Sequence, residues 1–474
     1  MDLYVRQWAC DTPYEDVMGC SSVGRSFDAS RGDHGHIRNG EWDMAKRLAE
    51  SGRKASPDFA LLAEGSGELV SRWAMGMTSN RHYGWRDLRA HRLAHPDHIL
   101  FLGGSNGGYH EMLHNCELAY LCGARFDLIM AGDVFAIRKL VRFRVALNRW
   151  AARAAYRDTL GLELDDSRVL ATRHERLAGG ARGVLVTAVN REGVKDAPLG
   201  VAVAVFEGKP FGAFWLDEDG GARRIEPAVT GGLLRTAVPP AGLSALLLVA
   251  EAPKDEDLLG GVVLARKPNA CEARAWLCNL APRARDIELR LDGPAGNGET
   301  RRVRLEPFGV FNAAFALPLG PGDGYVRLHA EGRELAVSYL YPLLADPSYE
   351  AKGTEAPDAP DGRRVLHFGP RKGWQGHGAA LELAPGGKYL IQAKGRRTGT
   401  KGAIHGLVIM ERPNGKKEYA GIHFPKDQQD FAAWVDLRAE FKAPGDLTGA
   451  SLYLYNSDSE ETVDYDAVRV EMLE

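Results

Sequence analysis

The chain has 474 residues, of which 45% are hydrophobic and 26% are charged, and its formal net charge is −3. At roughly 150 residues per domain, this length predicts three or four domains rather than one. No apolar run approaches the roughly 20 residues needed to span a bilayer, so no membrane span is expected. A near-neutral charge without a concentrated basic face argues against a nucleic-acid partner.

The six cysteines show neither CxxC pairs nor the density of a disulfide scaffold, so a metal or redox framework is not expected from them. Met1 leads directly into an apolar stretch, without the basic segment or cleavage site of a signal peptide. We expect an extracellular or periplasmic location only if a signal peptide lies upstream.

Residues 1–157 alternate strand-like and helical segments, which is typical of a parallel sheet built from βα units. The expected strands are 3–8, 58–63, 69–76, 98–102 and 126–130, and the expected helices are 42–51, 85–94, 109–122 and 134–156. The arginines of the last helix are interpreted as its solvated side. A barrel of this kind has eight strands, so we expect the C-terminal part of a (β/α)8 barrel whose first three strands are absent.

The remainder of the chain consists of short alternating runs separated by Gly, Pro and Asp turns, which predicts all-β domains. We expect a β-rich domain at 158–255, a β-sandwich at 256–345 and a Pro- and acid-rich linker at 346–362. About eight short strands in 363–474 predict a jelly-roll-like β-sandwich.

Glu64 is the strongest candidate for chemistry in the first domain. It ends the apolar run 59–63 and precedes Gly-Ser-Gly, and the reacting groups of such barrels project from the carboxyl ends of strands. A general acid/base, a hydrogen-bond acceptor for sugar hydroxyls and a salt-bridged rim residue are all open interpretations. Glycosidic hydrolysis normally needs two carboxyl groups, and Asp11 is the candidate partner, with Asp33 and Asp133 as alternatives.

Further polar residues follow the expected strands. Arg6 and Gln7 end the first strand, and the long loop after it contains candidates for sugar binding or a metal, namely Asp33, His34, His36 and Trp42. Hydrogen bonding to a sugar, with Trp42 as a stacking surface, and a purely structural loop are both retained. The glycine-rich loop around Asn106 lacks the ending of a phosphate-binding loop and is interpreted as facing substrate.

In their order, Leu3–Gln7, Asp33–His36, a Trp-bearing helix and Leu61–Gly65 resemble the latter half of glycoside-hydrolase-like barrel proteins related to the α-galactosidase type. The resemblance implies a glycosidase barrel followed by β-sandwich domains. Family members carry Asp-Gln at the first of these strand ends, where this chain has Arg6-Gln7. A guanidinium cannot act as a nucleophile, so retaining hydrolysis is in doubt.

The last domain resembles family-four and family-nine-like carbohydrate-binding modules, in Trp434-Val435-Asp436 and in the segment 463–470. Aromatic side chains stack on sugar rings in such modules, and the candidates here are Trp374, Tyr419, His423, Trp434, Tyr453 and Tyr455. Core packing is the alternative for each. The resemblance also implies a structural Ca²⁺ site that includes Asp466, while no cofactor is required.

Taken together, these features predict a glycoside-hydrolase-related protein that hydrolyses or binds a polysaccharide or oligosaccharide. The alternative is a catalytically inactive carbohydrate-binding protein, or a truncated piece of a glycosidase.

Overall fold

The computed structural model describes residues 14–15, 37–57, 59–63, 73, 76–79, 85–96, 98–103, 109–127, 134–151, 153–190, 192–219, 221–240, 242–267, 270–293, 298–318, 324–340, 343–344, 353–398, 403–412, 415–423, 432–459 and 461–473. The chain separates into two compact units. Unit 1 contains Met1–Gly261, Trp276–Ile287 and Arg302–Asn312, and unit 2 contains Val262–Ala275, Glu288–Arg301 and Ala313–Glu474.

Unit 1 begins with five parallel strands paired in chain order: β1 (Tyr14–Glu15), β2 (Leu62–Ala63), β3 (Gly76–Ser79), β4 (Ile99–Gly103) and β5 (Arg125–Asp127). The helices α1 (Ile37–Ala55), α3 (Trp85–Ala94), α4 (Tyr109–Cys122) and α5 (Val134–Ala151) follow β1, β3, β4 and β5. Such helices are the crossovers that parallel pairing requires. The described strands form an open row, so the βα alternation is present but a (β/α)8 barrel is not shown.

The prediction of a helix over 134–156 extends too far at its C-terminal end. Helix α5 ends at Ala151, and strand β6 (Ala155–Asp158) follows it. Tyr156 is buried with Leu88, Leu100 and Cys122, and it pairs antiparallel with His174. Burial of this ring in tertiary contacts therefore outweighs the local helical pattern.

Two antiparallel sheets complete most of unit 1. A six-stranded sheet has the order β12-β11-β15-β9-β8-β6, and a four-stranded sheet has the order β13-β14-β10-β7. The bounds are β7 (Leu162–Leu164), β8 (Leu170–Arg176), β9 (Arg182–Val189), β10 (Ala197–Ala202), β11 (Gly212–Asp217), β12 (Ala222–Ile225), β13 (Val229–Thr230), β14 (Leu233–Val238) and β15 (Leu243–Glu251).

The six-stranded sheet is buried on both faces. Leu185 and Leu247 share one core with Trp150 of α5, whereas Val186 and Leu246 belong to a second core with Leu234 of the smaller sheet. A strand covered on both sides needs an unbroken apolar sequence, because its side chains alternate between the faces. This explains why the sequence of β15 consists almost entirely of small and apolar residues.

The next strands form two further sheets, ordered β16-β17-β20 and β19-β18-β21-β22, and the division between the units passes along them. Their bounds are β16 (Leu258–Lys267), β17 (Ala270–Asn279), β18 (Arg285–Asp292), β19 (Gly298–Leu305), β20 (Val310–Pro318), β21 (Gly324–Ala330) and β22 (Arg333–Leu340).

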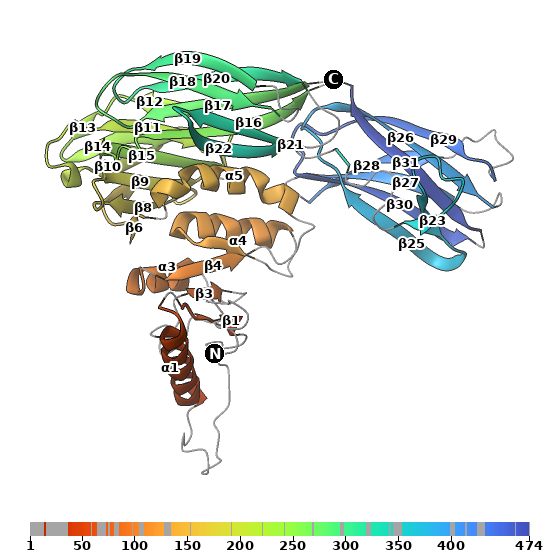
Figure 1. Ribbon diagram of the computed structural model, residues 1–474, viewed down its shortest axis with the longest axis horizontal. Helices are drawn as coiled ribbons and strands as arrows, with labels where there is room; N and C mark the ends of the chain where they lie inside the picture. The colour runs from red at the N-terminus through yellow and green to blue at the C-terminus, as the bar shows by residue number, and fades with distance from the viewer. Residues whose placement is uncertain are drawn as a thin grey trace, which may run out of the picture. The chain divides into compact units, whose positions relative to one another are not determined.

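The end of unit 2 is a β-sandwich, drawn in blue in Figure 1. Sheet A has the order β23-β24-β31-β26-β29 and sheet B the order β25-β30-β27-β28. The bounds are β23 (Thr354–Glu355), β24 (Arg364–Phe368), β25 (Arg371–Ala380), β26 (Lys388–Arg397), β27 (Ala403–Glu411), β28 (Lys417–His423), β29 (Val435–Lys442), β30 (Gly449–Ser459) and β31 (Val463–Met472).

One core joins the two sheets of this sandwich. Tyr389, Leu437 and Tyr465 of sheet A are buried in the same cluster as Val408 and Leu454 of sheet B. From β24 onward the chain alternates between the sheets, with only β27 and β28 as neighbours within one sheet. This is the connectivity of a jelly roll, and the predicted β-sandwich at the end of the chain is confirmed.

Among the described residues, no helix combines the length and the apolar character that crossing a membrane requires.

Candidate functional site

Most residues expected to carry chemistry in the first domain lie outside the described residues: Arg6, Gln7, Asp11, Asp33, His34, His36, Glu64, Asn106 and Asp133. The strand that Glu64 follows in sequence is described. It is β2, which pairs in parallel with both β1 and β3. Glu64 itself lies outside the described residues, so its position at the carboxyl end of a strand stays a prediction.

Trp42 lies within α1 and is half-buried. Its ring meets that of Trp73 edge to face, with the centroids 6.0 Å apart, and Lys46 Nζ lies 5.2 Å from the Trp42 ring centre. Trp42 thus already contacts Trp73 and Lys46 within the protein. A stacking role for Trp42 toward a sugar stays a prediction.

Sheet B of the sandwich gathers aromatic side chains on its outer side. Leu452 and Leu454 of β30 are buried in the core, whereas Tyr453 and Tyr455 are only partly buried. Because successive residues of a strand point to opposite faces, both tyrosines lie on the side away from the core. The alternative of core packing is therefore wrong for these two rings.

Strand β28 contributes two more rings to the same side. Ile422 is buried between its neighbours, while His423 is exposed and Tyr419 has 60% of its surface exposed. The register through β27 places His423 in the row of Tyr455, and Tyr419 in the row of Ser451. We call the outer side of sheet B with Tyr419, His423, Tyr453 and Tyr455 the tyrosine face.

Two glycines leave room for rings of the tyrosine face to approach the sheet backbone. A Cβ atom at Gly378 would come within 2.9 Å of the Tyr453 ring, and one at Gly421 within 2.4 Å of His423 Nε2. Any larger residue would collide with these rings. The rings of Tyr453 and His423 therefore lie close to backbone positions that glycine leaves open.

The edge of the tyrosine face contains an ion pair between Lys417 Nζ and Glu411 Oε1, 3.0 Å apart. The pKa of Lys417 is raised, first by its hydrogen bond with Glu411 and to a smaller extent by Tyr419 and Tyr453. Burial raises the pKa of Tyr455. Tyr455 is therefore a neutral hydroxyl donor and acceptor at neutral pH, and the edge charges compensate one another.

Trp374 belongs to β25, where its backbone pairs with Ser457 of β30, but its side chain lies outside the described part of the chain. Its predicted stacking role is untested.

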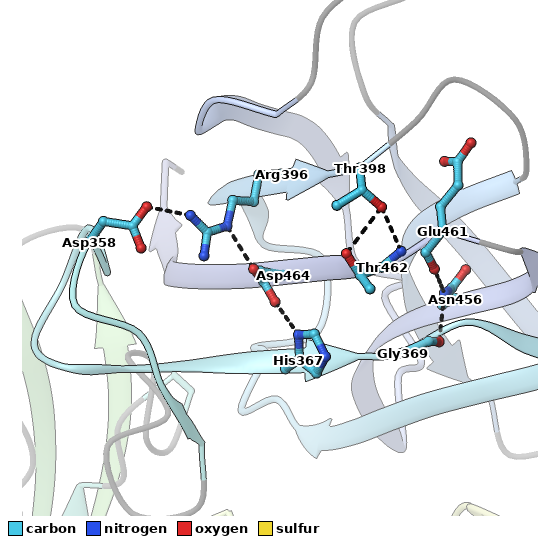
Figure 2. Close-up of polar contacts among 9 residues, drawn as sticks. All are labelled: Asp358, His367, Gly369, Arg396, Thr398, Asn456, Glu461, Thr462 and Asp464. Atoms are coloured by element: carbon cyan, nitrogen blue, oxygen red, sulfur yellow. Dashed lines mark hydrogen bonds and ion pairs between the residues drawn. The ribbon is translucent and has the colours of Figure 1, made fainter.

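Sheet A bears a row of polar side chains that crosses several strands, and Figure 2 shows it. His367 Nδ1 lies 2.6 Å from one oxygen of Asp464, and Arg396 Nε donates to the other oxygen at 2.6 Å. Arg396 also forms an ion pair with Asp358, and its guanidinium lies 4.5 Å from the ring centre of Trp434. Burial alone would lower the pKa of Arg396, but its hydrogen bonds to Asp464 and Asp358 raise it. The hydrogen bond from Arg396 lowers the pKa of Asp358.

Trp434 was expected among the sugar-binding rings of the sandwich. It directly precedes β29 of sheet A, so the structure does not place it among the rings of sheet B. Its Nε1–H donates to the carbonyl of Asp358 at 3.0 Å. This side chain therefore fastens the segment before β24 to the sandwich, a contact between residues far apart in sequence that the sequence pattern did not reveal.

Asp466, the expected calcium ligand, is fully buried and accepts a hydrogen bond from the backbone N–H of Asp361 at 2.8 Å. Within the described ranges, no group of three or more His, Cys, Asp or Glu side chains is arranged to hold a metal ion. Calcium binding by Asp466 therefore stays a prediction.

No family model and no curated protein matches this chain. Among solved structures, isomalto-dextranase of Arthrobacter globiformis T6 in complex with panose is 11% identical, covers 99% of this chain and 71% of its own, and gives a TM-score of 0.34. A family 16 carbohydrate-binding module is 15% identical over 27% of this chain and 98% of its own, with a TM-score of 0.23. The xylan-binding domain CBM22-1 from Paenibacillus barcinonensis Xyn10C is 18% identical over 26% and 81%, with a TM-score of 0.22.

Proposed function

We propose that the C-terminal sandwich binds a neutral oligosaccharide or polysaccharide on its tyrosine face. The observation that supports this most directly is the set of rings on β30 and β28 of sheet B, on either side of β27, with the Tyr453 ring close to Gly378. The apolar face of a pyranose ring packs on an aromatic face, while polar groups at the rim of the aromatic ring bind the sugar hydroxyls.

The dimensions of the tyrosine face favour a chain of sugars over a single ring. Tyr455 and Tyr419 are four residues apart along the strands and two strands apart across the sheet, as the register shows. This separation is about 16 Å, from about 3.3 Å per residue and about 4.8 Å between strands. A ligand that contacts both rings must therefore extend over several sugar units.

The test is affinity electrophoresis of the full chain in gels that contain dextran, xylan or hydroxyethylcellulose. If the unmodified chain is retarded, Tyr453→Ala should weaken binding roughly 5- to 30-fold, the effect of losing a central aromatic contact of about 1–2 kcal/mol. Tyr453→Phe keeps the ring and loses only the hydroxyl, so it should retain most of the affinity. Equal losses in both variants, or no retardation by any of the three polymers, would refute the proposal.

We further propose that the first domain is the C-terminal part of a glycosidase barrel of the α-galactosidase type. The row of parallel strands and the position of Glu64 directly after β2 support this. Glu64 would donate the proton and Asp11 would be the second carboxyl group, with Arg6, Gln7 and Asn106 among the substrate contacts.

An inactive sugar-binding protein is the competing proposal for this domain, because Arg6 stands where the family carries its nucleophile. Turnover of aryl glycosides by the unmodified chain, abolished in Glu64→Gln, would support catalysis. Turnover that is unchanged in Glu64→Gln would remove this residue from the mechanism.

A further inference from the structure

We infer that the chain has a second saccharide-binding surface, formed by Tyr325 and Tyr339 on the outer side of the sheet β19-β18-β21-β22. The inference rests on the proposed function, because it assigns a neutral polysaccharide to a second place in unit 2. We call these two residues the tyrosine pair.

The tyrosine pair is formed by the register of two adjacent strands. Tyr325 of β21 lies directly opposite Tyr339 of β22, and their ring centroids are 4.8 Å apart at an interplanar angle of 58°. Val326 and Leu328, the alternate residues of β21, are fully buried. Tyr325 therefore lies on the face of the sheet opposite to the core.

Exposure distinguishes Tyr325 from the other aromatic residues. It is 54% exposed, and among the described residues only Tyr419 of the tyrosine face is a comparably exposed large aromatic side chain. Packing in the core therefore does not explain why a large aromatic residue stands at this position. The similarity to Tyr419 suggests the same kind of ligand.

Polar groups beside the pair favour a sugar over a protein partner. The guanidinium of Arg327 lies 5.4 Å from the ring centre of Tyr325, and its Nη1 pairs with Glu334 Oε2 at 2.7 Å. Both members of this ion pair are nearly half exposed, so they lie at the surface beside the tyrosine pair. An aromatic face flanked by planar polar groups is suited to a pyranose, which presents C–H groups on its faces and hydroxyls at its rim.

The charges indicate that the ligand is neutral. Arg327 is compensated by Glu334, and Asp292 on the adjacent strand is within 2.6 Å of Arg290 and 3.3 Å of His329. A polyanion would require uncompensated cations, which these pairs do not provide. A neutral polysaccharide fits both this surface and the tyrosine face, and two contacts with one polymer would raise its overall affinity.

The experiment compares Tyr325→Ala, Tyr453→Ala and the double variant of the full chain in the same three polymer gels, with Tyr325→Phe as the matched control. Tyr325→Ala should raise the apparent Kd for the retarding polymer about 3- to 10-fold, Tyr325→Phe should have a smaller effect, and the double variant should bind more weakly than either single variant. Thermal unfolding verifies that each variant is folded.

The outcomes separate this inference from the proposed function. Retardation that is weakened by Tyr453→Ala but unchanged by Tyr325→Ala would overturn the second surface and leave the tyrosine face intact. A chain that no polymer retards would overturn both. Sedimentation that shows dimers of the unmodified chain and monomers of Tyr325→Ala would make the pair a contact between copies and would also overturn the inference.

Discussion

Replacing Gly378 by alanine tests whether the position of the Tyr453 ring close to this glycine matters for binding. The added Cβ would lie 2.9 Å from Cε1 and Cζ of Tyr453, whereas carbon atoms in contact prefer about 3.5–4.0 Å. The ring must therefore move outward by roughly 0.6–1.1 Å, which holds the ligand away from another ring of the tyrosine face by that distance and forfeits about a quarter to a half of the contact energy there. Of a contribution of about 1–2 kcal/mol, this is about 0.3–1 kcal/mol, or a rise in Kd of roughly 2- to 5-fold.

The stability of the sandwich should not fall with this change. Alanine is favoured over glycine within a strand by about 0.5–1 kcal/mol, and the atoms that must move are the free end of a side chain. The assay is the Kd from affinity electrophoresis together with the free energy of unfolding in urea. Gly445→Ala is the matched control, because nothing lies within 4 Å of a Cβ at that position. Unchanged affinity in folded Gly378→Ala, or an equal loss in Gly445→Ala, would contradict the geometry.

Three further predictions concern stability. Burial first, and the charge of Arg144 second, lower the pKa of His174 to about 3. Because the unfolded state binds a proton at this residue near pH 6.5, the free energy of unfolding should fall as pH falls from about 6.5 toward 3. His174→Gln should remove up to roughly 4–5 kcal/mol of this pH dependence, measured by urea unfolding across that range. Gly183→Ala should destabilise unit 1 by about 1–3 kcal/mol in the same assay, because its Cβ would lie 2.4 Å from the buried Trp150 ring; an unchanged transition would refute this. Arg396→Ala should cost about 1–3 kcal/mol in thermal unfolding, because the mostly buried Asp464 loses its main cation, and Arg396→Lys should recover part of the loss.

Local pattern sufficed for several elements of the fold. The helices at 85–94 and 109–122 were predicted with the bounds that α3 and α4 have, because Gly or Pro stands near each end, at Gly84 and Pro96 and at Gly108 and Gly123. The end of α5 was missed, because Tyr156 is drawn into β6 by residues distant in sequence such as Leu88 and Leu100. Burial against such residues is a tertiary effect that no local window contains.

The candidate site shows the same limit. Tyr453 and Tyr455 were nominated from the resemblance to carbohydrate-binding modules, and the burial of Leu452 and Leu454, which alternate with them and whose burial the sequence does not state, places both rings on the outer side. The placement of Tyr419 and His423 on the same face depends on the register across β27, and the role of Gly378 depends on a ring 75 residues further along the chain. Trp434 was assigned to the sugar site from its resemblance to carbohydrate-binding modules, and its bond to the Asp358 carbonyl, which spans 76 residues, lies beyond any local pattern.

The core of the terminal sandwich is drawn from one uninterrupted stretch of chain. Among the described residues, its buried members run from Leu344 to Val468. A fold that builds its interior from one continuous stretch can be transplanted onto other proteins. Fused to a fluorescent reporter, residues 343–473, which keep Leu343 and Leu344 with this core, would form a portable probe for whichever polymer the tyrosine face retains.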